Sequence, residues 1–142
     1  MFLPKTLVLC LAVLQVSALS GGRSSNVGEF PGFVGIVMPT NTQVCGGTIF
    51  NRNHVLTVAN CMLNANNLLL APNQISILSG ENNIDYGRSR MPVRAIYVHP
   101  QFNPFTFEND IAVVQTQFDF DFPRVPTPLV APVQISSRIG NN

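Results

Sequence analysis

The chain has 142 residues, a formal net charge of +1 and only 11 % charged residues. This length is that of one domain, or of part of a larger one. A charge so near zero gives nucleic acid or an anionic membrane no electrostatic reason to bind, so we expect neither as a partner. Because a typical soluble domain has about 25 % charged residues, the low value indicates that part of the surface is covered by another surface.

Residues 1–18 carry the three parts of a secretory signal peptide. Lys5 supplies the positive start, residues 7–14 form the apolar centre, and Val16-Ser17-Ala18 is a cleavage site of small residues. The apolar run is too short to span a membrane, and no later run is long enough. We therefore expect a secreted, extracellular protein.

Three cysteines are present, and Cys10 would leave with the leader. Cys45 and Cys61 remain, and a single bridge between them fits an oxidising compartment. No Cys-x-x-Cys or His-x-x-x-His cluster occurs, which argues against zinc. Glu81 and Asp85 supply too few oxygens for calcium, which takes about six or more. We therefore expect no metal and no cofactor.

The first predicted strands form a hairpin. The apolar run from Phe33 to Met38 indicates a strand buried on one face. Residues 39–42 have the composition of a turn, and residues 42–45 begin the next strand.

The stretch from Cys45 to Cys61 predicts a second reversal of the chain. Gly46-Gly47 allow a close backbone approach or an unusual φ. Residues 51–53 form a polar turn, and the apolar run 55–59 then brings the chain back beside its start. The two cysteines can then bond, which would stabilise the fold by about 3 kcal/mol in the chain-entropy model.

Two further strands are predicted later in the chain. Residues 61–73 read as an irregular connection, and residues 74–80 alternate as a strand does. Residues 81–89 have the composition of an exposed loop. Residues 91–98 form another strand, and His99-Pro100 ends it in a turn.

Phe118, Phe120 and Phe122 alternate with polar residues, which predicts a segment with one aromatic face. We interpret that face as core packing, or as a wall between two half-domains, rather than as an exposed binding edge. Residues 125–136 are apolar and interrupted by prolines.

Three motifs together resemble the trypsin/chymotrypsin-like serine peptidases. They are V-G-E-F-P at 27–31, C-G-G-T-I with V-L-T-V-A-N-C across 45–61, and N-D-I-A-V-V at 109–114. The resemblance implies an all-β fold with little helix, namely the first of the two antiparallel six-stranded β-barrels of the trypsin-like fold. Residues 19–142 would then form the N-terminal barrel and the crossover, with the second barrel absent.

The resemblance also places two residues of a catalytic triad. Asp110 falls where the family keeps its buried aspartate, and Asn60 stands where it keeps the histidine base. An amide cannot accept a proton near neutral pH, and no G-D-S-G segment supplies a nucleophile. We expect the Asn60 side-chain NH₂ to donate a hydrogen bond to Asp110. His54 and His99 are not expected to replace the base.

The family's mature chain begins I-V-G-G and is freed by a cut after a basic residue. No basic residue precedes Gly21-Gly22, so this activation is not expected, and residues 19–26 read as a flexible leader.

The resemblance implies a secreted trypsin-like domain that is catalytically inactive and acts by protein binding or by regulating extracellular proteolysis. Its partner would be another protein or a second copy, bound through the exposed inter-barrel face. The alternative is an incomplete fragment of a longer serine endopeptidase or homologue. A third hypothesis, an active hydrolase, requires recruitment of His54 or His99 and a serine from another chain.

Overall fold

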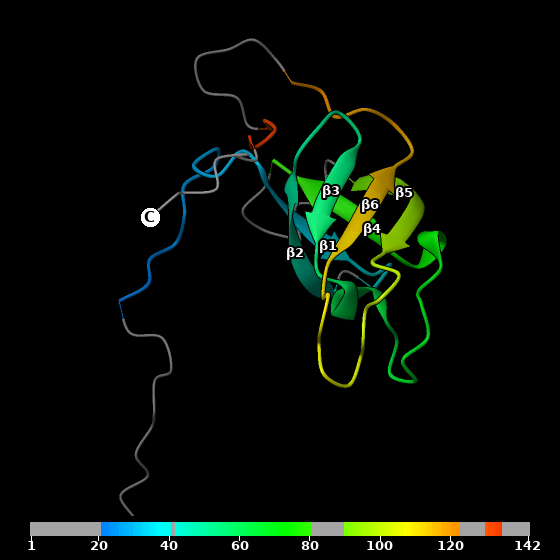
Figure 1. Ribbon diagram of the computed structural model, residues 1–142. Coiled ribbons are helices and arrows are strands. Elements are labelled where there is room, and N and C mark those ends of the chain that lie inside the picture. Colours follow the sequence, from blue (N-terminus) through cyan, green and yellow to red (C-terminus); the bar gives the residue numbers. More distant parts are fainter. Residues whose placement is uncertain (1–20, 41, 81–89, 123–129, 135–142) are drawn as a thin grey trace, which may run out of the picture.

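The computed structural model describes residues 21–40, 42–80, 90–122 and 130–134. Within these residues the protein is a closed antiparallel β-barrel of six strands with two short 3₁₀ helices (Figure 1). The predicted fold class is confirmed. The predicted signal peptide, the loop at 81–89 and most of the apolar segment at 125–136 lie outside the described residues.

The barrel closes in the order β1-β2-β3-β6-β5-β4, with β4 paired back to β1. Every pairing is antiparallel. The strands are β1 (Phe33–Val37), β2 (Gln43–Ile49), β3 (His54–Thr57), β4 (Ser76–Ser79), β5 (Arg90–Val98) and β6 (Ala112–Thr116). The 3₁₀ helices are η1 (Ala59–Met62), directly after β3, and η2 (Pro72–Gln74), before β4.

The core fills the inside of the barrel with alternate residues of the strands. In β3 and β6 every second side chain is buried, because successive side chains of a strand point to opposite faces. The fully buried large side chains are mostly branched aliphatics, which suit a pleated surface. They include Val34, Ile36, Ile49, Val55, Ile77 and Val114.

Gly46-Gly47 serve a close approach between strands. A Cβ built on Gly47 would lie 2.6 Å from Cγ1 of Val55 and 3.2 Å from the carbonyl oxygen of Leu56. A Cβ on Gly46 would lie 2.9 Å from the ring of Phe33. Neither glycine has a positive φ, so of the two predicted reasons for the pair, the close approach is the one found.

The predicted disulfide joins Cys45 in β2 to Cys61 in η1, with the Cα atoms 6.1 Å apart. The bridge closes a sequence separation of 16 residues around the β2–β3 hairpin. It therefore ties η1 to the barrel wall.

The prediction that Phe118, Phe120 and Phe122 lie on one aromatic face is wrong. Phe120 is buried in the core, and its ring lies 6.3 Å from that of Phe122. Phe118 is 59 % exposed. The segment follows the end of β6 and is not a strand, so its side chains do not alternate between two faces. Core packing holds for two of the three phenylalanines.

The close approach at Gly47 predicts a large cost for a small substitution. We expect Gly47→Ala to lower the free energy of unfolding by about 1–3 kcal/mol, because the new methyl group overlaps Val55 and backbone. Gly22→Ala is the matched control, since nothing lies within 4 Å of its added Cβ. Urea unfolding of both oxidised variants measures the difference, and equal midpoints would contradict the close approach.

Candidate functional site

Asn60 and Asp110 lie next to each other at one end of the barrel. β3 pairs with β6, and Thr57 at the end of β3 faces Ala112 at the start of β6. Asn60 follows β3 in η1, and Asp110 precedes β6 by two residues. The register therefore brings together two residues that are 50 positions apart in the sequence.

The contact between them is made by the main chain of Asn60. Its backbone N–H donates to Oδ1 of Asp110, with the nitrogen and oxygen 2.7 Å apart. The predicted donor, the side-chain NH₂, is not the one found: among the described residues the hydrogen bond to Asp110 comes from the main chain, and Asn60 is exposed. The first N–H groups of a helix have no partner within the helix, and Val58 supplies no side-chain cap. Asp110 satisfies one of these groups.

A compact loop between β5 and β6 holds Asp110 in place. Oδ1 of Asn103 accepts the N–H groups of Phe105 at 2.9 Å and Thr106 at 3.3 Å. Asn109 adopts a φ of 56° and donates its side-chain Nδ2 to the carbonyl of Gln101 at 3.0 Å. Asparagine tolerates this left-handed conformation better than most residues, and here it sets the backbone turn immediately before the carboxylate.

In the part of the chain that the structure describes, no hydrogen bond joins either histidine side chain to Asp110. His54 stands at the start of β3, about 10 Å along the strand from Thr57. Its Nδ1 lies 2.9 Å from Oδ1 of Asn51. Nδ1 of His99 accepts the N–H of Gln101 at 3.2 Å, which holds that ring in the turn after β5. These positions argue against either histidine acting as the base in place of a residue at position 60.

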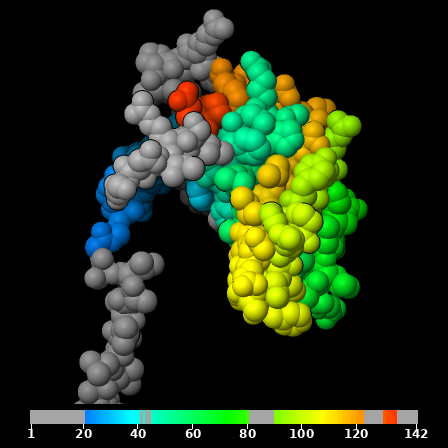
Figure 2. Space-filling view, in the orientation of Figure 1, coloured from blue at the N-terminus to red at the C-terminus, as the bar shows by residue number. Residues whose placement is uncertain are grey.

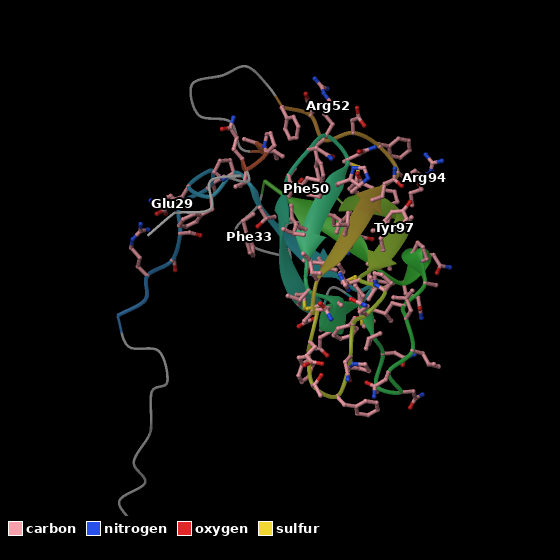
Figure 3. The ribbon with its side chains drawn as sticks, viewed as in Figure 1. Glu29, Phe33, Phe50, Arg52, Arg94 and Tyr97 are labelled. Carbon is pink, nitrogen blue, oxygen red and sulfur yellow. A yellow bond between two sulfur atoms is a disulfide. The ribbon has the colours of Figure 1, made fainter. Side chains whose placement is uncertain are left out.

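Apolar side chains remain exposed on two parts of the surface. One is an open groove of about 320 Å³, which we call the N-terminal groove; its lining includes Glu29, Phe30, Phe33, Ala131 and Val133. Phe30 is 65 % and Phe33 is 52 % exposed. Figure 3 places Glu29 and Phe33 on the same side of the barrel, and Figure 2 shows residues 130–134 (red) at the surface near the upper end of the molecule. The N–H of Ala131 donates to the carbonyl of Pro31 at 2.9 Å, which joins this segment to the chain just before β1.

The second apolar surface, which we call the loop end, lies at the same end of the barrel as Asp110. Phe105 is 82 % and Phe107 is 53 % exposed in the loop between β5 and β6. Leu68 and Leu69, exposed by 62 % and 52 %, lie in the connection between η1 and η2. Figure 1 shows both loops extending from this end of the barrel. Sequence reasoning missed these residues because their exposure depends on tertiary structure.

Among the described residues, no three His, Cys, Asp or Glu side chains gather as a metal-ligand set. In the same residues no helix is long and apolar enough to cross a membrane.

A closed antiparallel barrel of six strands is the fold that the resemblance to the trypsin-like peptidases predicts. A family model described as Trypsin matches residues 19–139, so the chain belongs to the trypsin family. It is 29 % identical over 133 residues to mannan-binding lectin serine protease 1 of Rattus norvegicus, and the matched region covers 80 % of this chain and 19 % of that protein. It is 30 % identical over 112 residues to trypsin, alkaline A, of Manduca sexta, covering 76 % of this chain and 42 % of that one.

A third relative, serine proteinase stubble of Drosophila melanogaster, is 29 % identical over 132 residues, which are 86 % of this chain and 16 % of that protein. The chain therefore spans less than half the length of each of these relatives.

The backbone hydrogen bond predicts unequal effects of two alanine substitutions. Asp110→Ala removes the charged acceptor of the Asn60 N–H, and we expect it to lower the free energy of unfolding by about 1.5–3 kcal/mol. Asn60→Ala keeps the N–H, so its effect should stay within about 0.5 kcal/mol. Urea denaturation measures both, and a larger loss in Asn60→Ala would show that the side chain carries the interaction.

Proposed function

We propose that this trypsin-family chain is a non-catalytic serine peptidase homologue. The observation that carries the proposal is Asn60, which stands at the family's base position and beside the retained Asp110. The carboxylate binds a main-chain N–H, an interaction that any residue except proline at position 60 would provide. Asp110 can therefore remain useful to the fold after the base has been lost.

The loss of the base has a large effect on hydrolysis. A carboxamide has no useful basicity near neutral pH, and removing the histidine of a comparable triad lowers turnover by about a million-fold. The side chains of His54 and His99 have other hydrogen-bond partners, Asn51 and the Gln101 N–H, and among the described residues neither bonds to Asp110. The site therefore lacks a group that could activate a serine hydroxyl, whether or not a serine is provided elsewhere.

We propose that the protein acts in the extracellular space by binding proteins and regulating proteolysis. The N-terminal groove supports this role, because Phe30 and Phe33 are large, exposed and adjacent on one side of the barrel. Exposed apolar patches of this kind mark interaction surfaces. The low fraction of charged residues, 11 %, fits a surface that a partner covers. The partner would be a second copy or another polypeptide bound at the inter-barrel face.

A second candidate is that the chain is part of a longer serine endopeptidase or homologue. The supporting observation is that the chain covers only 42 % of trypsin, alkaline A. Asn60 would stand at the base position in that longer protein as well, so both candidates predict an inactive site. They differ in whether a second barrel is part of the protein.

Hydrolysis of small fluorogenic substrates tests the proposed inactivity. We expect the purified protein to release no fluorophore from arginine- or phenylalanine-type peptides under conditions in which a trace of trypsin does so. Turnover that a serine-directed inhibitor abolishes would refute the proposal.

Size-exclusion chromatography over a range of concentrations tests the binding face, and a monomer at every concentration would argue against self-association.

Replacing Asn60 by histidine tests whether this is the vacated base position. In Asn60→His the introduced imidazole should have a pKa above its ordinary value of about 6.5, because the nearby Asp110 carboxylate stabilises the charged ring. An NMR titration of the ring protons measures this pKa. The double variant with Asp110→Asn is the control and should return the pKa toward its ordinary value. An unshifted pKa in Asn60→His would remove the argument from position.

A further inference from the structure

The segment before β1 holds an arginine in an ion pair on the protein surface. Residues 21–27 are all exposed and belong to no helix or strand. From this segment Nη1 of Arg23 donates to Oε2 of Glu29 at 2.9 Å, and Nη2 pairs with Oε1. The Arg23 side chain is nevertheless 68 % exposed. Figure 3 shows Glu29 in this part of the chain, away from the barrel wall.

Glu29 is positioned for this pair by its own backbone. Its carboxylate also accepts the N–H of Asn26 at 2.9 Å, and its own N–H donates to the Asn26 carbonyl at 3.1 Å. Gly28, with a φ of 77°, allows the turn. The hydrogen bond from Arg23, and secondly the one from the Asn26 N–H, lower the pKa of Glu29, so the carboxylate is charged at neutral pH.

The other arginines that the structure describes have more constrained main chains. Arg52 lies in the tight turn between β2 and β3, where its carbonyl accepts the N–H of Phe120 at 2.6 Å. Arg90 and Arg94 lie within β5, where Arg90 pairs with Leu78 of β4 and Arg94 lies at the register shift between Val93 and Ala95 in the pairing with β6. Arg23 alone among these four lies in an exposed segment outside the barrel.

We propose that the Arg23–Ser24 peptide bond is a processing site for an arginine-specific endopeptidase, and that Glu29 restrains its cleavage. Exposed segments of small polar residues are preferred sites of proteolytic cleavage, and Ser24 and Ser25 follow the arginine directly. An arginine-specific enzyme places the guanidinium against a carboxylate in its own pocket. The Arg23 side chain must therefore leave Glu29 before it can enter that pocket.

The reaction is a hydrolysis that needs only water and the external endopeptidase. The bond between the carbonyl carbon of Arg23 and the nitrogen of Ser24 breaks. The hydroxyl of water joins the carbonyl carbon and its proton joins the nitrogen, so that the products at neutral pH are a carboxylate on Arg23 and an ammonium on Ser24. Arg23 is then no longer joined through the chain to Glu29, which is one of the residues that line the N-terminal groove. Processing would thus change the charge balance of that groove.

Limited digestion followed by mass spectrometry tests the proposal. The purified full-length chain is treated with a trace of trypsin at neutral pH, and cleavage after each arginine is followed separately over time. We expect the bond after Arg23 to be cut faster than the bonds after Arg52, Arg90 and Arg94. Arg23→Gln should abolish the product that begins at Ser24.

A charge-removing variant tests the restraint by Glu29. Glu29→Gln keeps an oxygen for the Asn26 N–H and removes the charge, and it should speed cleavage after Arg23 by about three- to fivefold, as suits an exposed ion pair. Glu108→Gln makes the same change in a loop whose carboxylate contacts Thr106 instead, and should leave the rate unchanged. Circular dichroism before digestion verifies that both variants are folded. The proposal fails if cleavage after Arg23 is no faster than after the barrel arginines, or if the two variants behave alike.

Discussion

The hydrogen bond between the Asn60 N–H and the Asp110 carboxylate links the two halves of the site and uses only the main chain of Asn60. It joins the helix after β3 to the residue before β6, and these two strands are neighbours in the barrel. A donor from the main chain survives replacement of the side chain. The structural contact of the aspartate is therefore independent of the side chain at position 60, where we propose that the family's base is replaced. This contact would keep its place in the fold whichever residue other than proline stood at position 60.

The barrel could be predicted largely from local pattern. Apolar runs and alternation located β1, β4 and β5 to within one or two residues, because one face of each strand must be buried. The paired glycines and the two cysteines predicted the close packing around the β2–β3 hairpin. The segment at 118–122 misled the same reasoning, because alternation implies two faces only when the backbone is extended in a strand. There the chain bends to donate the N–H of Phe120 to the Arg52 carbonyl.

The sequence indicated which two residues belong to the candidate site, but it did not indicate which of their atoms form the hydrogen bond. Motif spacing alone located Asn60 and Asp110, since the family resemblance carries over residue by residue. Which atom of Asn60 meets the carboxylate depends on how η1 begins, and sequence pattern does not contain that detail. The exposed rings of Phe105 and Phe107 were missed for a related reason. A phenylalanine in a sequence is expected to be buried, and only the arrangement of the surrounding loop shows that these two are not.

Closure of the barrel limits how any partner can be recognised. Each of the six strands has a neighbour on both sides, because β4 returns to β1. No strand therefore stands at the outer edge of an open sheet, the place where a peptide from another molecule most readily adds, although β2 pairs with β3 only at Thr48 and Ile49. A partner of the described barrel would therefore be recognised by side chains and loop surfaces. The selectivity of that binding would depend on shape and surface chemistry more than on backbone hydrogen bonds between strands.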